Sequence, residues 1–66
     1  MPNKYYVLYS RSEATYLCGF ALPNMPVYNR HLDNALQFND PEGAEACAIS
    51  LKLDGQLYCE VEEILA

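Results

Sequence analysis

The sequence has little of what metal sites and disulfide frameworks need. It contains no tryptophan, three cysteines and one histidine, His31. An odd cysteine count without a Cys-x-x-Cys pair does not indicate a disulfide framework or a zinc site, and a lone histidine cannot supply a paired ligand set. We therefore expect reduced, buried thiols, no metal and no cofactor, and a reducing compartment, the cytoplasm.

Catalytic and targeting motifs are also missing. There is no glycine-rich phosphate loop and no calcium-binding loop. The first four residues lead into tyrosines and not into an apolar leader, and no apolar run is long enough to cross a membrane. A thiol of Cys18 or Cys59 activated by His31 could in principle be a nucleophile, but no spacing requires it. Glu60, Glu62 and Glu63 are close enough in sequence to suggest acid–base work, but we expect them to be solvated. We expect no catalytic residues, and a protein that is not an enzyme.

Positive charge is scarce, and its distribution is uneven. The net charge is −5. Residues 1–38 hold three basic and two acidic side chains, whereas residues 39–66 hold seven acidic side chains and a single lysine. Phosphate would repel so acidic a domain, so direct binding to nucleic acid or to an anionic membrane is not expected. A basic protein partner suits this charge, and solubility alone is the simpler explanation.

The first third of the chain predicts strands. Lys4 to Ser10 and Ala14 to Phe20 are rich in tyrosine, valine and leucine and are separated by a short polar turn, which is typical of a hairpin. Gly19 suggests a bulge or a close approach of backbones. Prolines interrupt residues 21–26, so we expect a loop there, then a short strand over residues 27–29 and a helical turn near Asp33.

The strongest local signal begins at Asp40. Asp40 is a good N-cap, Pro41 suits the first helical position, and Gly55 suits a left-handed C-cap, so the sequence predicts a helix over residues 41–53. Its apolar side chains recur at the spacing of one helical face: Ala44, Cys47, Ala48 and Leu51.

Residues 56–65 alternate in polarity and predict a final strand, with Glu60 and Glu62 on its wet face. The 66 residues thus form one α+β domain, with a mainly antiparallel sheet of three to four strands in the order β-β-(β)-α-β and one helix on one face.

One short helix cannot cover both faces of such a sheet. Both faces of the first strand are apolar or aromatic, so a tyrosine-bearing surface should be left for a partner, unless residues 21–39 fold over it. The partner is a protein or a second copy of the chain, as a homodimer. The residues expected to form the protein-binding surface are Tyr6, Leu8, Tyr58, Glu60 and Glu62.

The layout resembles small accessory proteins of bacteriophages and prophages. The resemblance lies in residues 4–7 (KYYV), in Ala35, Phe38, Asp40 and the Cys47-Ala48 pair, and in residues 60–62 (EVE). It implies a host-interaction protein, and one alternative within that class is an acidic inhibitor of a nucleic-acid-binding defence protein, as some anti-CRISPR proteins are. A small enzyme or enzyme subunit is the second alternative.

Overall fold

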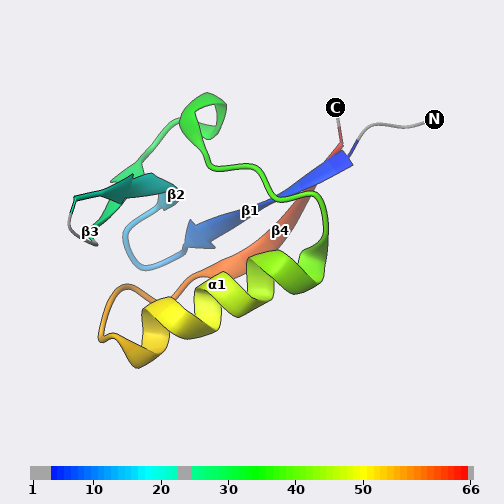
Figure 1. Ribbon diagram of the computed structural model, residues 1–66. Coiled ribbons are helices and arrows are strands. Elements are labelled where there is room, and N and C mark those ends of the chain that lie inside the picture. Colours follow the sequence, from blue (N-terminus) through cyan, green and yellow to red (C-terminus); the bar gives the residue numbers. More distant parts are fainter. Residues whose placement is uncertain (1–3, 23–24, 66) are drawn as a thin grey trace.

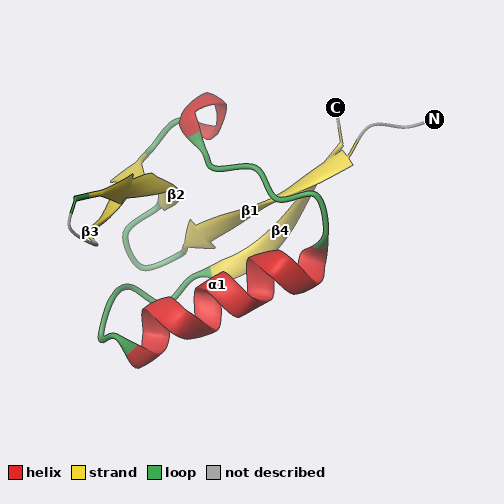
Figure 2. Cartoon of the chain, viewed as in Figure 1, coloured by secondary structure: helices red, strands yellow, loops and turns green. Residues whose placement is uncertain are grey.

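The computed structural model describes residues 4–22 and 25–65. Its elements follow the order β1 (Lys4–Ser10), β2 (Thr15–Ala21), β3 (Met25–Asn29), a 3-10 turn (Leu32–Asn34), α1 (Pro41–Leu53) and β4 (Glu60–Leu65). The four strands form one antiparallel sheet in the order β3-β2-β1-β4, and α1 packs against one face of it (Figure 1; Figure 2). The predicted α+β fold is confirmed.

The helix follows its local signals at both ends. The Asp40 carboxylate accepts a hydrogen bond of 2.6 Å from the Gly43 amide, which satisfies a free N–H of the first turn. At the other end the Gly55 amide donates to the Lys52 carbonyl and the Gln56 amide to the Leu51 carbonyl, with Gly55 at φ 78°. This is the pair of bonds of a Schellman cap. The predicted range 41–53 is confirmed.

The cap also explains why the last strand is shorter than predicted. Gln56 uses its amide to close the helix, so residues 56–59 lead back to the sheet, and β4 begins at Glu60 and not at Gln56. From there it pairs with β1 without interruption, from Lys4 opposite Leu65 to Tyr9 opposite Glu60.

The first hairpin is splayed. β1 and β2 pair only at their joined ends, where Tyr9 lies opposite Tyr16 and Ser10 opposite Thr15. Further along β1 the place of β2 is taken by Phe38, which exchanges backbone hydrogen bonds of 2.9 and 2.8 Å with Tyr6. The segment after the 3-10 turn therefore fills the opening between the two strands, as the loop crossing β1 in Figure 1 shows.

The structure confirms one of the two predictions made for the second hairpin and contradicts the other. The predicted irregularity near Gly19 is confirmed as a register shift between Leu17 and Gly19. The expectation of a loop up to Pro26 is wrong, because β3 starts at Met25 and Phe20 lies opposite Pro26. β3 is an edge strand, and an edge strand tolerates proline because alternate N–H groups point away from the sheet.

The core lies between α1 and the sheet. Ala44, Ala48 and Leu51 pack from the helix onto buried side chains of the sheet, with Cys47 partly buried beside them. The sheet and its flanking loop contribute Tyr6, Leu8, Leu17 and Cys59 to this core.

Burial of the β1 side chains corrects one expectation. Tyr6 is 8% exposed and Leu8 is fully buried, so both lie beneath α1 and not on an uncovered face. Both faces of β1 carry apolar residues, so alternation alone does not tell which face the helix covers. Tyr6 suits burial because its hydroxyl reaches the rim of the core and donates to Oε1 of Glu63 at 3.2 Å.

Candidate groove beside an edge strand

Tyr5, Tyr9 and Tyr16 lie on the face of the sheet opposite α1, whereas Tyr28 packs against the core and Tyr58 precedes β4. Tyr9 and Tyr16 pack with their ring centroids 4.9 Å apart, and both are half-buried, while Val7 of the same face is fully buried. Burial raises the pKa of Tyr16, and the neighbouring Glu62 carboxylate and Tyr9 raise it further. The rings thus pack against one another and leave little open aromatic surface.

A groove of about 410 Å³ lies instead on the other side, between α1 and the start of β4. Its lining is apolar at the bottom and charged at the rim. The lining residues are Glu45, Ala48, Ile49, Lys52, Tyr58, Cys59, Glu60 and Val61.

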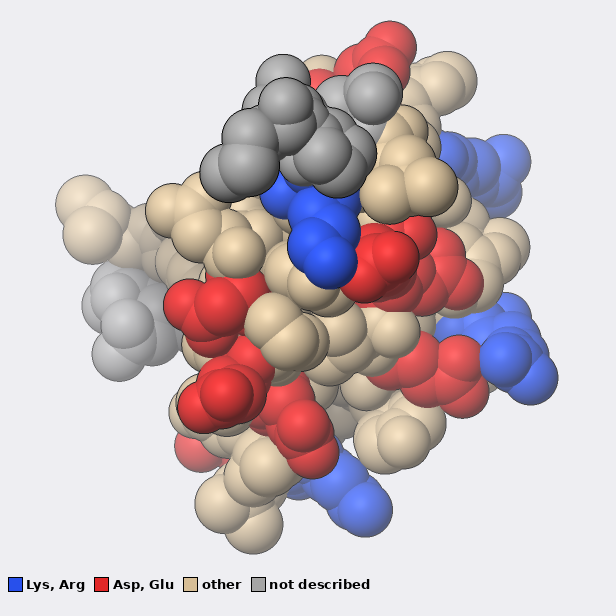
Figure 3. Space-filling view, turned by 90° about the vertical axis from the view of Figure 1, so that its right-hand side faces the viewer, with Lys and Arg blue, Asp and Glu red and all other residues tan. Residues whose placement is uncertain are grey.

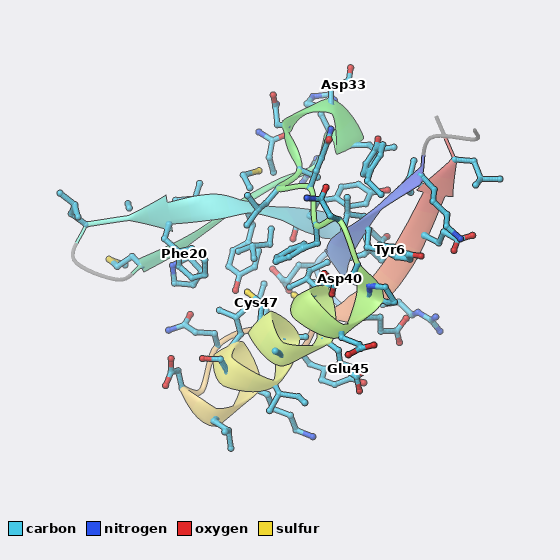
Figure 4. The ribbon with its side chains drawn as sticks, turned by 45° about the vertical axis from the view of Figure 1, so that its right-hand side comes forward. Tyr6, Phe20, Asp33, Asp40, Glu45 and Cys47 are labelled. Carbon is cyan, nitrogen blue, oxygen red and sulfur yellow. The ribbon has the colours of Figure 1, made fainter. Side chains whose placement is uncertain are left out.

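The helix lines the groove with one side. Ala48 lies at its bottom, buried against the core, whereas Ile49 keeps 52% of its surface exposed. Glu45, one turn before Ile49 and labelled on α1 in Figure 4, also lines the groove. Covering the exposed half of this isoleucine would remove apolar surface from water, which favours binding.

Two of the residues that line the groove form a cation–π contact. The Nζ atom of Lys52 lies 5.5 Å from the centroid of the Tyr58 ring, and this ring is 59% exposed. Tyr58 thus presents a flat, amphipathic surface at the mouth of the groove, which is a common feature of protein-binding sites.

The strand that borders the groove is at the edge of the sheet. β4 pairs with β1 on one side, and no described residue pairs with its other side. An edge strand presents unpaired N–H and C=O groups to which another chain can hydrogen-bond. The groove and this edge adjoin at Glu60 and Val61, so a segment bound along β4 would reach Ile49 and Tyr58.

The acidic side chains of β4 differ in their pairing. Glu60 forms an ion pair of 2.9 Å with Arg11, and Glu63 one of 3.7 Å with Lys4. Both pairs are solvent-exposed, and such pairs contribute little to stability. Among the described residues Glu62 has no ion-pair partner. Acidic side chains are spread in several groups over the side of the molecule in Figure 3.

The residues predicted from sequence to form a protein-binding surface therefore do not lie together. Tyr58 and Glu60 line the groove, and Glu62 follows on the same edge strand. Tyr6 and Leu8 belong to the core, and we no longer propose them as contact residues. Sequence reasoning missed Ile49 and Lys52. In the sequence, only their positions beside the apolar face of the helix set them apart.

The tip of the β2–β3 hairpin is a second exposed apolar region. Phe20 projects from β2 toward the side on which α1 lies (Figure 4). Residues 14–29 contain no charged side chain, and several large apolar residues there are more than 40% exposed: Phe20, Leu22, Met25 and Val27.

Cys18, Cys59 and His31 make separate hydrogen bonds in the described part of the chain. Burial raises the pKa of Cys47 and of Cys59, and the proximity of Cys47 raises that of Cys59 further. Within residues 4–22 and 25–65 no hydrogen bond links His31 to a cysteine, and no three His, Cys, Asp or Glu side chains gather as metal ligands do. In the same part of the chain no helix is both long and apolar enough to cross a membrane.

Comparison with protein families, with curated proteins and with solved structures gave no match.

Proposed function

We propose that this chain is a non-catalytic protein-binding domain, which binds an extended segment of a partner protein along β4. The observation that supports it most is the edge of β4 lying directly beside the groove that Ile49 and Tyr58 line. In β-strand addition, main-chain hydrogen bonds supply affinity and pockets for alternate side chains supply specificity. In this chain the strand edge that can supply such hydrogen bonds and the groove that can take side chains lie side by side. The partner would be a cytoplasmic host protein, in line with the resemblance to phage and prophage accessory proteins.

Selection from a random-peptide display library against the full chain tests this proposal. We expect selected peptides to shift the backbone amide signals of Glu60–Leu65 in NMR spectra. We also expect Ile49→Gln to weaken their binding about tenfold, because a contact at the centre of such a site contributes about 1–2 kcal/mol.

The matched control is Leu53→Gln. Leu53 lies on the same helix and is 81% exposed, but it does not line the groove. The same change there should leave binding unaltered. Peptides that respond equally to both substitutions, or that shift only the β2–β3 hairpin, would contradict binding along β4.

Self-association is the alternative that a specific surface favours. The exposed apolar residues at the tip of the β2–β3 hairpin lie in an uncharged stretch, so the net charge of −5 opposes their association less than it would elsewhere. Under this alternative sedimentation should reveal a homodimer that Met25→Asp dissociates and Ile49→Gln does not.

The acidic-inhibitor alternative predicts binding to a basic nucleic-acid-binding protein that weakens with salt. Its support is the charge of residues 39–66. Ion pairs with Arg11 and Lys4 partly neutralise two of the carboxylates that an inhibitor of this kind would present, which makes it the weaker alternative.

The small-enzyme alternative has the least support, because a nucleophilic thiol needs a lowered pKa and burial raises the pKa of Cys47 and Cys59. Rapid alkylation of Cys18, Cys47 or Cys59 at neutral pH in the folded protein would revive it.

A further inference from the structure

We infer that the segment bound along β4 is basic, with lysine or arginine at alternate positions and apolar residues between them. This inference rests on the proposed binding along β4 and specifies the chemistry of the partner. It follows from the side-chain pattern that β4 offers on each of its two faces.

The two faces of β4 are set by its pairing with β1. Glu60 lies opposite Tyr9 and Glu62 opposite Val7, whereas Val61 lies opposite Leu8 and packs against the core beneath α1. Directly paired residues lie on the same face of a sheet. Glu60 and Glu62 therefore lie on the face away from α1, and Val61 lies on the helix side. The alternation ends there, because Glu63 lies opposite Tyr6 on the helix side and Ile64 opposite Tyr5 on the far side, so the pattern applies to the end of β4 that borders the groove.

An added strand would alternate in the same way. Its side chains on the helix side would enter the groove beside Ile49 and Ala48, which calls for apolar residues. Its intervening side chains would lie beside Glu60 and Glu62, where opposite charges across neighbouring strands are favourable by about 0.2–1 kcal/mol per pair.

Glu62 is the better placed of the two carboxylates. Glu60 already pairs with Arg11 at 2.9 Å, whereas Glu62 has no ion-pair partner among the described residues. A lysine or arginine of the bound segment would supply the missing counter-charge.

The same charges argue against a second copy of the chain as the occupant. β4 reads EVEEIL and contains three glutamates and no basic residue. Pairing two such strands would place carboxylates beside carboxylates, which is unfavourable. The other edge strand, β3, reads MPVYN, has no basic residue either, and contains a proline without an N–H.

Three synthetic peptides test the inference on the full chain, with affinity measured by fluorescence polarisation and the site located by NMR. The first alternates lysine and valine over ten residues, the second has glutamate in place of lysine, and the third has the composition of the first with five lysines followed by five valines. We expect the alternating lysine peptide to bind along Glu60–Leu65, the glutamate peptide not to bind, and the block peptide to bind at least about fivefold more weakly.

Charge reversal at one position identifies the contact. Glu62→Lys should weaken binding of the alternating lysine peptide about tenfold, because an attractive cross-strand pair becomes repulsive. The matched control is Asp33→Lys, which changes the net charge equally and lies in the exposed 3-10 turn away from β4. It should have a much smaller effect. Circular dichroism of both variants checks that the fold is retained.

The outcomes separate this inference from the proposal on which it rests. If library-selected peptides bind along β4 but are acidic or uncharged, the basic partner is excluded and the binding site stands. Equal losses for Glu62→Lys and Asp33→Lys, or no binding of the alternating lysine peptide, would also overturn the inference. A homodimer dissociated by Ile49→Gln but not by Leu53→Gln would show that a second copy occupies the groove, and would overturn it too.

Discussion

Tyr6 and Phe38 exchange two backbone hydrogen bonds, of 2.9 and 2.8 Å, although 32 positions separate them in the sequence. Through this pair the loop before α1 becomes part of the sheet. The Phe38 ring also packs against the buried core. The beginning of the helix is thereby held close to β1.

Replacing Phe38 by alanine tests how much this attachment contributes. The main-chain bonds can persist in the variant, but the ring is lost from the core, and we expect the free energy of unfolding to fall by about 2–4 kcal/mol. Urea denaturation followed by circular dichroism measures it. Gln37→Ala, at the exposed neighbouring position, is the control and should change stability by less than about 0.5 kcal/mol. Equal effects would show that the ring does not stabilise the core.

The Asp40 cap should contribute about 1 kcal/mol to stability. Asp40→Ala removes the acceptor of the 2.6 Å bond from the Gly43 amide and should lower the free energy of unfolding by roughly that amount. Asp40→Asn keeps a side-chain oxygen in place and should restore most of the loss. If alanine and asparagine are equivalent, the cap does not stabilise the helix, and thermal denaturation of the two variants decides this.

The Tyr28 hydroxyl is a buried polar group without a hydrogen-bond partner among the described residues. Burial and the nearby Cys59 thiol raise its pKa, whereas the Leu57 backbone acts in the opposite direction. Because an unpaired buried hydroxyl costs stability, Tyr28→Phe should raise the free energy of unfolding by about 1 kcal/mol. Tyr58→Phe, at an exposed ring, should be neutral. A destabilised Tyr28→Phe variant would mean that the hydroxyl is hydrogen-bonded in solution.

Stability should decline in alkali. Burial is the main cause that raises the pKa of Cys47 and Cys59 above the ordinary 9.0, and that of Tyr16 and Tyr28 above 10.0. A group that is more weakly acidic in the folded state contributes stability that is fully present below its unfolded pKa and is lost as the pH rises through the folded one. The free energy of unfolding should therefore begin to fall above about pH 9 and fall further above about pH 10.

Urea titrations at a series of pH values measure this decline, and Tyr28→Phe should reduce the part that begins near pH 10. Stability that increases over the same range would contradict the burial of these groups.

The amino-acid sequence by itself determined the elements whose signals are local. The N-cap, the proline after it, the apolar stripe and Gly55 lie within sixteen consecutive residues and fix α1 from Pro41 to Leu53. The register shift near Gly19 and the alternation of Val61 with its acidic neighbours are likewise properties of short segments.

Tertiary structure decided what depends on distant residues. Tyr6 and Leu8 alternate with Tyr5, Val7 and Tyr9, and both sets are apolar enough to be buried, so only packing against α1 determined which set lies in the core. Similarly, β4 borders a groove because it occupies the edge of the sheet and α1 lies beside it. Strand order and helix position arise from contacts between segments far apart in the chain, and no local periodicity encodes them.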